Sequence, residues 1–260
     1  FISKMNYSWL ILCFLSQTLG SPGNPRICNG KEASEGQFPY QVSLQVNLFD
    51  THARHLCGGS IVGSKKIITA AHCRYPGLYA VLGEHDLEKD TGREQRIKVL
   101  DFIPHENYTE LEETDALYDI AVVKLKDQIM FNDYVQPIKL DEDDDEETGE
   151  VCTISGWGKL EDMTSPDVLH YAEVTIISFE ECKAKWAVYE QTIRPRTVCT
   201  YDEGRYTGPG TGDSGGPLVC FQGDNMKQVG VISQGPSNTF FNLPAMHVKV
   251  SDFFQWISEK

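Results

Sequence analysis

The chain has 260 residues, of which 38 are acidic and 23 are basic, so its formal net charge is −15 at pH 7 with neutral histidines. This charge excludes binding to nucleic acid by overall electrostatic attraction. Hydrophobic residues make up 40% of the chain and charged residues 23%, which excludes a disordered chain and suits one large domain or two small ones with a sizeable core.

The first segment has the layout of a secretory signal peptide. Residues 9–15 are apolar, and small and polar residues follow up to Gly20, where we expect cleavage. A buried strand or helix is the alternative for the apolar run. Residues 1–4 precede Met5, at which we start the natural chain. No run reaches the roughly 18 apolar residues of a membrane-spanning helix, so no membrane span is expected.

A short propeptide is expected next, over residues 21–26. Its prolines and glycine resist regular structure, and it ends in Arg26, which precedes apolar Ile27. The domain boundaries are therefore 1–20 for the leader and signal, 21–26 for the propeptide and 27–260 for the folded domain.

The folded part has the periodicity of β-strands. Residues 41–46 alternate polar and apolar, and further short runs occupy residues 67–69, 121–125 and 229–232. Many short strands and few helices predict an all-β sandwich or barrel. The aromatic residues of the last segment, 250–260, fit one terminal helix packed on it.

The cysteines indicate an oxidising compartment. Cys13 leaves with the signal, which leaves seven of the eight cysteines and one without a partner in the chain. Their wide, irregular spacing contains no CxxC pair, so disulfides are favoured over a zinc cluster. Asn107 begins a glycosylation acceptor sequence, Asn-Tyr-Thr, which is short enough to occur by chance.

An acidic stretch and four scattered histidines do not indicate a metal site. Residues 141–150 include eight acidic residues, and a solvated surface loop is favoured there over a calcium loop. Four scattered histidines lack metal-ligand spacing and are interpreted as surface or structural residues: His52, His55, His85 and His105.

Three short strings carry the chemistry. Thr-Ala-Ala-His-Cys contains His72, Asp-Ile-Ala begins with Asp119, and Gly-Asp-Ser-Gly-Gly-Pro contains Ser214 in a glycine-rich loop. A serine hydroxyl needs a base to become a nucleophile, and its transition state needs donors for an oxyanion. We expect His72 to be that base, Asp119 to orient it, and the N–H groups of Gly212 and Ser214 to bind the oxyanion.

On these strings the sequence resembles the trypsin and chymotrypsin family of serine endopeptidases over residues 27–260. Cys-Gly-Gly-Ser at 57–60, Ser-Gly-Trp-Gly at 155–158 and Gly-Pro-Leu at 216–218 carry the resemblance further. It implies two six-stranded antiparallel β-barrels with the triad in the cleft between them. It also implies hydrolysis of internal peptide bonds without a cofactor or metal.

The resemblance further implies a zymogen. An activating trypsin-like protease would cut after Arg26, and the freed amino group of Ile27 would pair with Asp213 to order the oxyanion loop. Cys28 would be left over, either to form an intermolecular disulfide or to stay a buried thiol. Position by position, the resemblance pairs the other cysteines as Cys57 with Cys73, Cys152 with Cys220, and Cys182 with Cys199.

The specificity pocket departs from the trypsin pattern. Gly208 stands where trypsin-like members carry an aspartate, and Ala245 replaces a usual pocket-wall glycine, so we expect an apolar, shallow slot. Cleavage is expected after Leu, Met, Phe or Tyr, or after smaller apolar residues. His247 lies near the same wall, where we expect packing with a hydrogen bond.

Two other departures affect substrate binding. The cysteine usual four residues before the nucleophile is Gly210, so the pocket-bracing disulfide is missing. In Ser233, Gln234 and Gly235, the segment that would pair with substrate backbone, an amide replaces the usual aromatic residue.

The sequence thus predicts a secreted, monomeric serine endopeptidase that cuts protein or peptide substrates and meets protein inhibitors. The alternative is a non-catalytic or weakly active homologue that acts as a binding or cofactor module, because fold alone does not establish activity.

Overall fold

The computed structural model describes residues 30–48, 52–109, 118–144, 148–160, 162–189, 193–203, 207–222, 225–235 and 243–260. The expected signal peptide, the propeptide with Arg26, Ile27 and Cys28 lie outside these residues, as do residues 145–147 of the acidic stretch.

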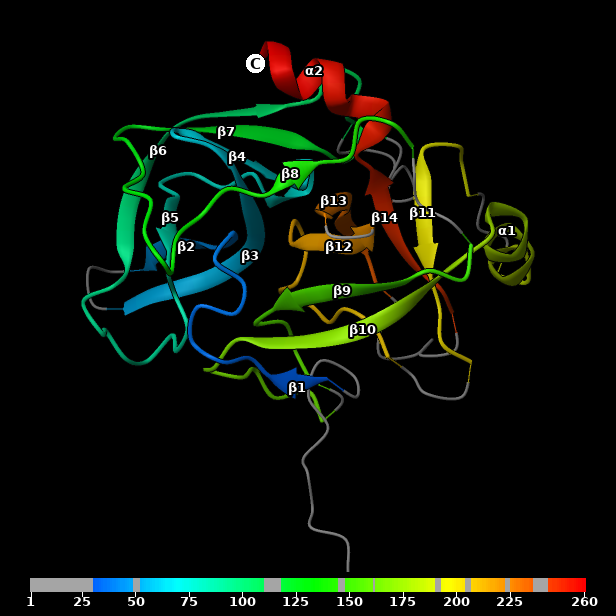
Figure 1. Cartoon of the computed structure of the whole chain (residues 1–260), viewed down its shortest axis with the longest axis horizontal. Coiled ribbons are helices and arrows are strands. Elements are labelled where there is room, and N and C mark those ends of the chain that lie inside the picture. Colours follow the sequence, from blue (N-terminus) through cyan, green and yellow to red (C-terminus); the bar gives the residue numbers. More distant parts are fainter. Residues whose placement is uncertain are drawn as a thin grey trace, which may run out of the picture.

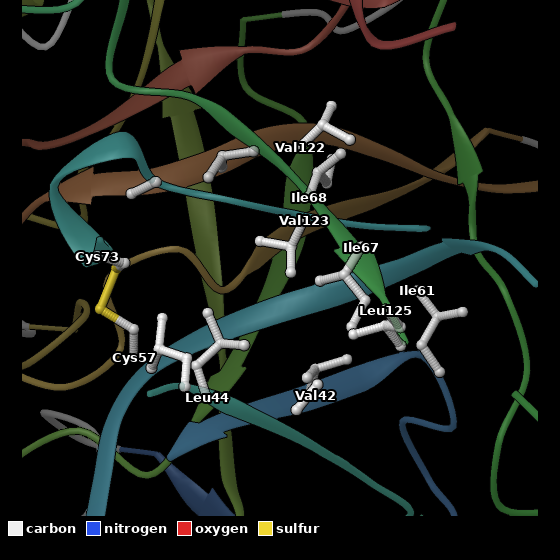
Figure 2. Close-up of a cluster of buried hydrophobic side chains, with 14 of the residues drawn as sticks. Val42, Leu44, Cys57, Ile61, Ile67, Ile68, Cys73, Val122, Val123 and Leu125 are labelled. Carbon is white, nitrogen blue, oxygen red and sulfur yellow. A yellow bond between two sulfur atoms is a disulfide. The ribbon is translucent and has the colours of Figure 1, made fainter. Parts of the chain in front are cut away.

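Six antiparallel strands close the first barrel in the order β2-β3-β4-β7-β6-β5 (Figure 1). They are β2 (Gln41–Leu48), β3 (His52–Gly63), β4 (Lys66–Thr69), β5 (Tyr79–Leu82), β6 (Gln95–Pro104) and β7 (Ala121–Leu125). Alternate residues of β2, Val42 and Leu44, are fully buried among the β-branched residues of β4 and β7 (Figure 2). The polar residues Ser43 and Gln45 are also buried, so β2 is buried on both faces as far as Val46.

A second barrel follows in the chain, with the order β9-β10-β11-β14-β13-β12 and closure between β12 and β9. Its strands are β9 (Val151–Gly156), β10 (His170–Ile177), β11 (Thr197–Thr200), β12 (Pro217–Gln222), β13 (Asn225–Gln234) and β14 (Ala245–Lys249). Two short strands flank it: β1 (Lys31–Glu32) pairs with β10, and β8 (Lys139–Leu140) runs parallel to β13. The predicted double barrel is confirmed.

The two barrels meet through close backbone contacts and buried hydrogen bonds. A Cβ added to Gly58 of β3 would lie 2.9 Å from the Gly216 Cα, so the loop before β12 touches the first barrel directly. The Ser60 hydroxyl donates to Gln228 at 2.6 Å, and the Ser155 hydroxyl donates to Gln41 at 2.7 Å. These contacts fix the position of the glycine-rich loop relative to β3.

Three disulfides tie loops to the barrels. Cys57–Cys73 joins β3 to the 3₁₀ turn η1 (Ala71–Cys73), and Cys152–Cys220 joins β9 to β12. Cys182–Cys199 joins the helix α1 (Phe179–Ala187) to β11. The pairs are the three that the resemblance implied. In the chain-entropy account, closure of the two short loops stabilises the fold by about 3 kcal/mol each and closure of the loop between Cys152 and Cys220 by about 4.4 kcal/mol.

The expected terminal helix is confirmed as α2 (Phe254–Glu259), which follows the 3₁₀ turn η3 (Ser251–Phe253). Phe253 and Ile257 lie one helical turn apart and pack into the first barrel's core. Helix α1 was not predicted, because among its residues only Cys182 and Trp186 are buried and its apolar stripe is narrow. None of the described helices is long and apolar enough to span a bilayer.

Candidate active site

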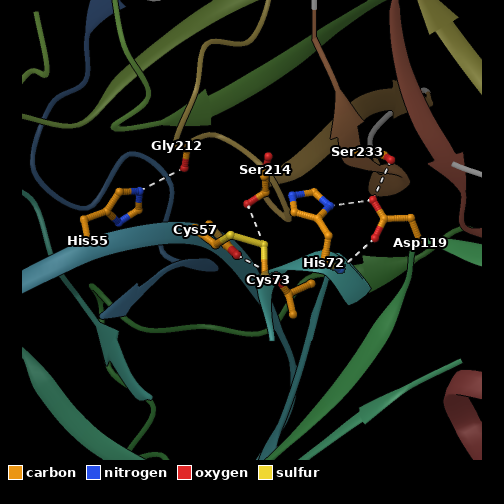
Figure 3. Close-up of a disulfide and its surroundings, with 10 residues drawn as sticks. His55, Cys57, His72, Cys73, Asp119, Gly212, Ser214 and Ser233 are labelled. Atoms are coloured by element: carbon orange, nitrogen blue, oxygen red, sulfur yellow. Dashed lines mark hydrogen bonds and ion pairs between the residues drawn. A yellow bond between two sulfur atoms is a disulfide. The ribbon is translucent and has the colours of Figure 1, made fainter. Parts of the chain in front are cut away.

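His72 sits in η1, where the Cys57–Cys73 disulfide anchors the turn to β3. Its ring Nδ1 lies 2.7 Å from Asp119 Oδ2, and its backbone N–H donates to Asp119 Oδ1 at 2.9 Å. One carboxylate therefore fixes both the ring and the main chain of His72. Figure 3 shows the other ring nitrogen on the side that faces Ser214.

Asp119 lies two residues before β7 and is 4% exposed. A third donor, the Ser233 hydroxyl at the end of β13, reaches its Oδ2 at 2.6 Å (Figure 3). Ser233 was expected at the site as a substrate-binding residue, and the structure places its side chain on the carboxylate. Three donors hold Asp119 in one orientation, which in turn fixes the imidazole.

The environment of His72 tunes its basicity. Burial opposes protonation of the ring, but the hydrogen bond to Asp119 and that residue's charge outweigh burial, so the pKa of His72 is raised above its ordinary value. A base with a pKa near neutrality can take a hydroxyl proton and return it.

Ser214 lies beside this pair in the loop before β12. The Gly58 N–H donates to the Ser214 carbonyl at 2.8 Å, and the Cys73 sulfur lies 3.6 Å from the same oxygen. The next residue, Gly215, has φ of +79°, and a Cβ there would lie 2.0 Å from Thr69 Oγ1. Only glycine permits this turn, which presents Ser214 to His72.

Gly212 precedes Ser214 by two residues and has φ of +110°. Its carbonyl faces His55, whose Nε2 lies 2.9 Å away, so the Gly212 peptide is held from behind (Figure 3). Within the described part of the chain, the N–H groups of Gly212 and Ser214 donate to no protein atom. Two free amides beside a nucleophile suit an oxyanion.

His55 is the residue of this site that sequence reasoning missed. It was interpreted as a surface or structural histidine, yet its Nδ1 lies 2.7 Å from Ser43 Oγ and its ring contacts Trp157. Burial lowers the pKa of His55 to about 4, against the opposing effect of the Gly212 carbonyl. The neutral ring therefore donates from Nε2 to Gly212 and accepts from Ser43.

Asp213 is buried behind the oxyanion loop. Its carboxylate accepts the N–H groups of Gly158 at 2.7 Å and Gly210 at 2.8 Å. A Cβ on Gly156 would lie 2.1 Å from one carboxylate oxygen of Asp213, and a Cβ on Gly158 would lie 2.2 Å from the other. Any larger residue at these two positions would clash with the carboxylate. Burial raises the pKa of Asp213 to about 6, and the two N–H donors offset this in part.

Comparisons with known proteins agree with this geometry. A protein-family model described as Trypsin matches residues 27–257. The chain belongs to the trypsin family of serine proteases. It is 35% identical over 241 residues to mouse (Mus musculus) kallikrein-11, covering 91% of this chain and 83% of the relative. It also resembles a solved structure of neuropsin, a serine protease expressed in the limbic system of mouse brain, with a TM-score of 0.77, 30% identity, and coverage of 88% of this chain and 97% of neuropsin.

The residues of the expected specificity slot differ in how open they are. A Cβ on Gly208 would meet nothing within 4 Å, so space lies in front of this residue. A Cβ on Gly235 would lie 2.6 Å from the Pro209 carbonyl, so the two facing segments of this trypsin-family member touch through their backbones. Ala245, the first residue of β14, is 3% exposed, and Gln234 ends β13 half-buried.

The structure explains why glycine occupies position 210, where the resemblance led us to expect a cysteine. A Cβ there would lie 2.0 Å from the Lys159 carbonyl oxygen, and the Lys159 N–H donates to Thr211 at 2.8 Å. Close packing of two backbones occupies the space that a side chain at position 210 would need. The pocket loop is thereby attached to the segment after β9 instead of to a disulfide.

His247 of β14 is fully buried, and its Nε2 lies 2.9 Å from Thr200 Oγ1. Burial lowers the pKa of His247 to about 3, so the ring stays neutral over the ordinary pH range. Packing with one hydrogen bond describes its environment.

Side chains of the types that bind metals lie close together in two places. The described residues offer two groups of candidate ligands, one around His72 and one around Glu150. Both depend on cysteines that form disulfides, namely Cys57–Cys73 and Cys152–Cys220, so neither group supplies a thiolate.

Proposed function

We propose that this protein is a secreted serine endopeptidase, made as a zymogen, that cuts peptide bonds after apolar residues through an acyl-enzyme on Ser214. The observation that carries the proposal is the arrangement of His72, with Asp119 fixed at 2.7 Å on one side and Ser214 on the other. The two unengaged N–H groups of Gly212 and Ser214 complete the set of groups that acyl transfer requires.

The proposed reaction has two halves, acylation of Ser214 and release of the acyl group by water. Each half uses these groups once. The Ser214 hydroxyl attacks the scissile carbonyl carbon while His72 Nε2 takes its proton. The negative oxygen of the tetrahedral intermediate accepts the two N–H groups. The carbon–nitrogen bond then breaks, His72 gives its proton to the leaving amine, and water releases the acyl group by the same steps. Asp119 stays ionised and stabilises the imidazolium.

Activation by cleavage after Arg26 is part of the proposal. Asp213 is a buried carboxylate that two amides satisfy, and within the described residues no cation pairs with it. A buried charge of this kind is stabilised by an opposite charge. The free amino group of Ile27 would supply one, and the domain would then begin at residue 27, after the signal and the propeptide.

The proposed preference for apolar residues rests on Gly208 and Ala245. Neither side chain can neutralise a lysine or an arginine, and a cationic side chain in an uncharged slot loses its hydration without compensation. Leu, Met, Phe, Tyr and smaller apolar residues are therefore the expected ones before the cut. Secretion accords with the three disulfides, which form and persist in oxidising compartments.

One observation favours the second candidate function, a non-catalytic or weakly active homologue that binds partners. A Cβ on Gly235 would lie 2.6 Å from the Pro209 carbonyl, so these two segments of the expected slot approach each other closely and leave less room between them for a substrate. Turnover that depends on Ser214 distinguishes the two functions.

The test is digestion of a diverse peptide mixture by protein cut after Arg26, read by mass spectrometry, with a Ser214→Ala variant as control. Cuts after apolar residues that vanish in the control support the proposal. Cuts after Lys or Arg contradict the proposed preference. An absence of cuts, with Ile27 verified as the new terminus, favours the binding homologue.

A further inference from the structure

One sequence motif, the Asn-Tyr-Thr acceptor sequence for N-linked glycosylation at residues 107–109, takes no part in the proposed reaction. It lies in the loop that follows β6. The chain contains one other such sequence, at Asn6, which falls in the segment that we expect to be removed with the signal peptide. The mature protein would therefore present Asn107 as its single acceptor.

The two residues before the acceptor asparagine attach this loop to the fold. The His105 N–H donates to the Ile120 carbonyl at 2.9 Å, and the His105 ring stacks on Tyr118 with 4.8 Å between the ring centroids. The Glu106 carboxylate accepts the Trp256 Nε1–H at 2.7 Å and so joins the loop to α2. The loop is thus anchored through residues 105 and 106.

The next residues turn the chain outward. The Tyr108 N–H donates to the His105 carbonyl at 2.9 Å, which closes a four-residue turn with Asn107 at its third position. The Asn107 N–H donates to His105 Nδ1 at 3.2 Å, so the main chain at Asn107 is engaged. Asn107 and Thr109 are exposed, whereas Tyr108 between them is half-buried. The two residues that the acceptor sequence specifies therefore lie on the solvent side of the loop.

The side-chain amide of Asn107 is free for substitution. Within the residues that the structure describes, it forms no hydrogen bond, and neither does the Thr109 hydroxyl. Asn132, by contrast, accepts the Tyr134 N–H at 2.8 Å with its side chain. A glycan is bulky and hydrophilic, so it needs an attachment point that faces water. At Asn107 it would break no hydrogen bond of the fold.

We propose that Asn107 is N-glycosylated as the chain passes through the secretory pathway. The inference rests on the secretion that is part of the proposed function, because that pathway supplies the donor, a lipid-linked oligosaccharide diphosphate. In the transfer, Asn107 Nδ2 forms a bond to the anomeric carbon of the oligosaccharide, the bond from that carbon to the diphosphate oxygen breaks, and the amide loses one proton. Asn107 keeps its Oδ1 and one Nδ2 hydrogen.

The test is expression of the full chain in secreting eukaryotic cells, with intact-mass measurement and peptide mapping of the protein in the medium. A glycan is expected on the peptide that contains Asn107, and an amidase that releases N-glycans should remove it and leave aspartate at position 107. Asn107→Gln and Thr109→Val should lose the glycan completely. Thr109→Ser retains the hydroxyl of the acceptor sequence and should retain the glycan. Thermal unfolding verifies that each variant is folded.

A second arm separates this inference from the proposed function. Residues 21–260 are expressed behind the signal peptide of an unrelated secreted protein, so that entry into the pathway no longer depends on residues 1–20. An unmodified Asn107 in this arm, or a glycan that persists in Thr109→Val, would overturn the inference.

The proposed function fails on different results. A native chain that stays in the cytosol, beside a glycan on the chain with the unrelated signal peptide, would overturn secretion but not the acceptor site. Absence of turnover by glycosylated protein cut after Arg26 would overturn the proposed endopeptidase activity alone. Ser214→Ala should carry the same glycan as the wild type, because the modification does not depend on turnover.

Discussion

The imidazole of His55 donates from Nε2 to the carbonyl oxygen of Gly212 at 2.9 Å and thereby joins strand β3 of the first barrel to the oxyanion loop of the second. The same ring accepts from Ser43 Oγ at 2.7 Å. The Gly212 carbonyl belongs to the peptide bond with Asp213, so His55 fixes the peptide that follows Gly212. The peptide that carries the Gly212 N–H is held by the Lys159 N–H, which donates to the Thr211 carbonyl at 2.8 Å. We therefore treat His55 as a positioning residue for the proposed oxyanion site that acts through the loop after Gly212.

A His55→Ala substitution should lower kcat by about 10- to 100-fold, below the loss from deleting an oxyanion donor outright. KM should change less, because the donor acts on the transition state. Steady-state kinetics with thermal unfolding as a control would measure this. Since the pKa of His55 is about 4, the ratio of wild-type to variant kcat should stay constant from about pH 6 to 9. A ratio that varied across this range would argue against a neutral ring.

The hydrogen bonds of His55 continue through Ser43 and Gln45 to Glu84, an acid whose pKa is shifted. Gln45 Nε2 donates to Ser43 Oγ at 3.1 Å and lies 3.3 Å from Glu84 Oε2. Burial raises the pKa of Glu84 to about 7, with the charge of Glu94 adding to it and the Gln45 bond opposing it. Glu84 therefore retains its proton at higher pH in the folded chain than in the unfolded chain.

The sign of the stability effect follows from that difference. Between the unfolded pKa of Glu84, near 4.5, and its folded value, near 7, the folded state binds more protons at this group, so the contribution of Glu84 to the free energy of unfolding falls as pH rises through this window. Buried His55 and His247 contribute with the opposite sign, so the test is the difference between variant and wild type. A Glu84→Gln variant should gain stability relative to wild type as pH rises from 4.5 to 8. Urea unfolding at pH 4.5 and pH 8 measures this gain, with Glu88→Gln as a control that should not show it. An equal difference between Glu84→Gln and wild type at the two pH values would contradict the assigned role of Glu84.

Asp119→Asn should reduce kcat by about 10⁴-fold, the magnitude of the corresponding change in the family's triad template. It should also move the acid limb of the pH–rate profile to lower pH. Burial lowers the pKa of His72, and only the hydrogen bond and charge of Asp119 raise it. Ser233→Ala, which removes the 2.6 Å donor to Asp119 but keeps the carboxylate, should cost far less. An acid limb at the same pH in Asp119→Asn would contradict the assigned cause.

Much of this site was predictable because local sequence encodes it. The strings around His72, Asp119 and Ser214 carry their own turn and strand signals, and the 121–125 run coincides with β7. His55 could not be recognised in this way, because its role depends on a contact with Gly212 across the barrels. A signal was present in its position shortly before Cys57, but no local pattern distinguishes a buried histidine from an exposed one.

The contact between Gly235 and Pro209 was likewise beyond sequence reasoning. It joins segments that are distant in the chain and depends on backbone positions, and glycine patterns report only conformational freedom. The expected shallow slot followed from side-chain volumes alone. Helix α1 shows the same limit, since its two buried residues are one turn apart within a polar segment.

Arg26→Gln should leave the chain inactive, because the amino group of Ile27 would never be released to pair with buried Asp213. Replacing residues 22–26 with the recognition sequence of an unrelated protease that leaves Ile27 at the new terminus should restore activation by that protease. Amidase assays before and after treatment, with terminal sequencing, measure both. Full activity of uncut Arg26→Gln protein would refute the zymogen proposal.

Gly208→Asp should introduce cleavage after Lys and Arg. The open space in front of Gly208 accepts a Cβ without a clash, so the carboxylate can enter the slot and pair with a basic side chain. Gly208→Asn, with the same shape and no charge, is the matched control and should leave basic residues uncut. The gain should be about tenfold or more in kcat/KM for Arg over Leu relative to wild type, since a partly desolvated ion pair contributes more than an exposed one. A gain shared by Gly208→Asn would assign the effect to backbone change at position 208 and not to charge.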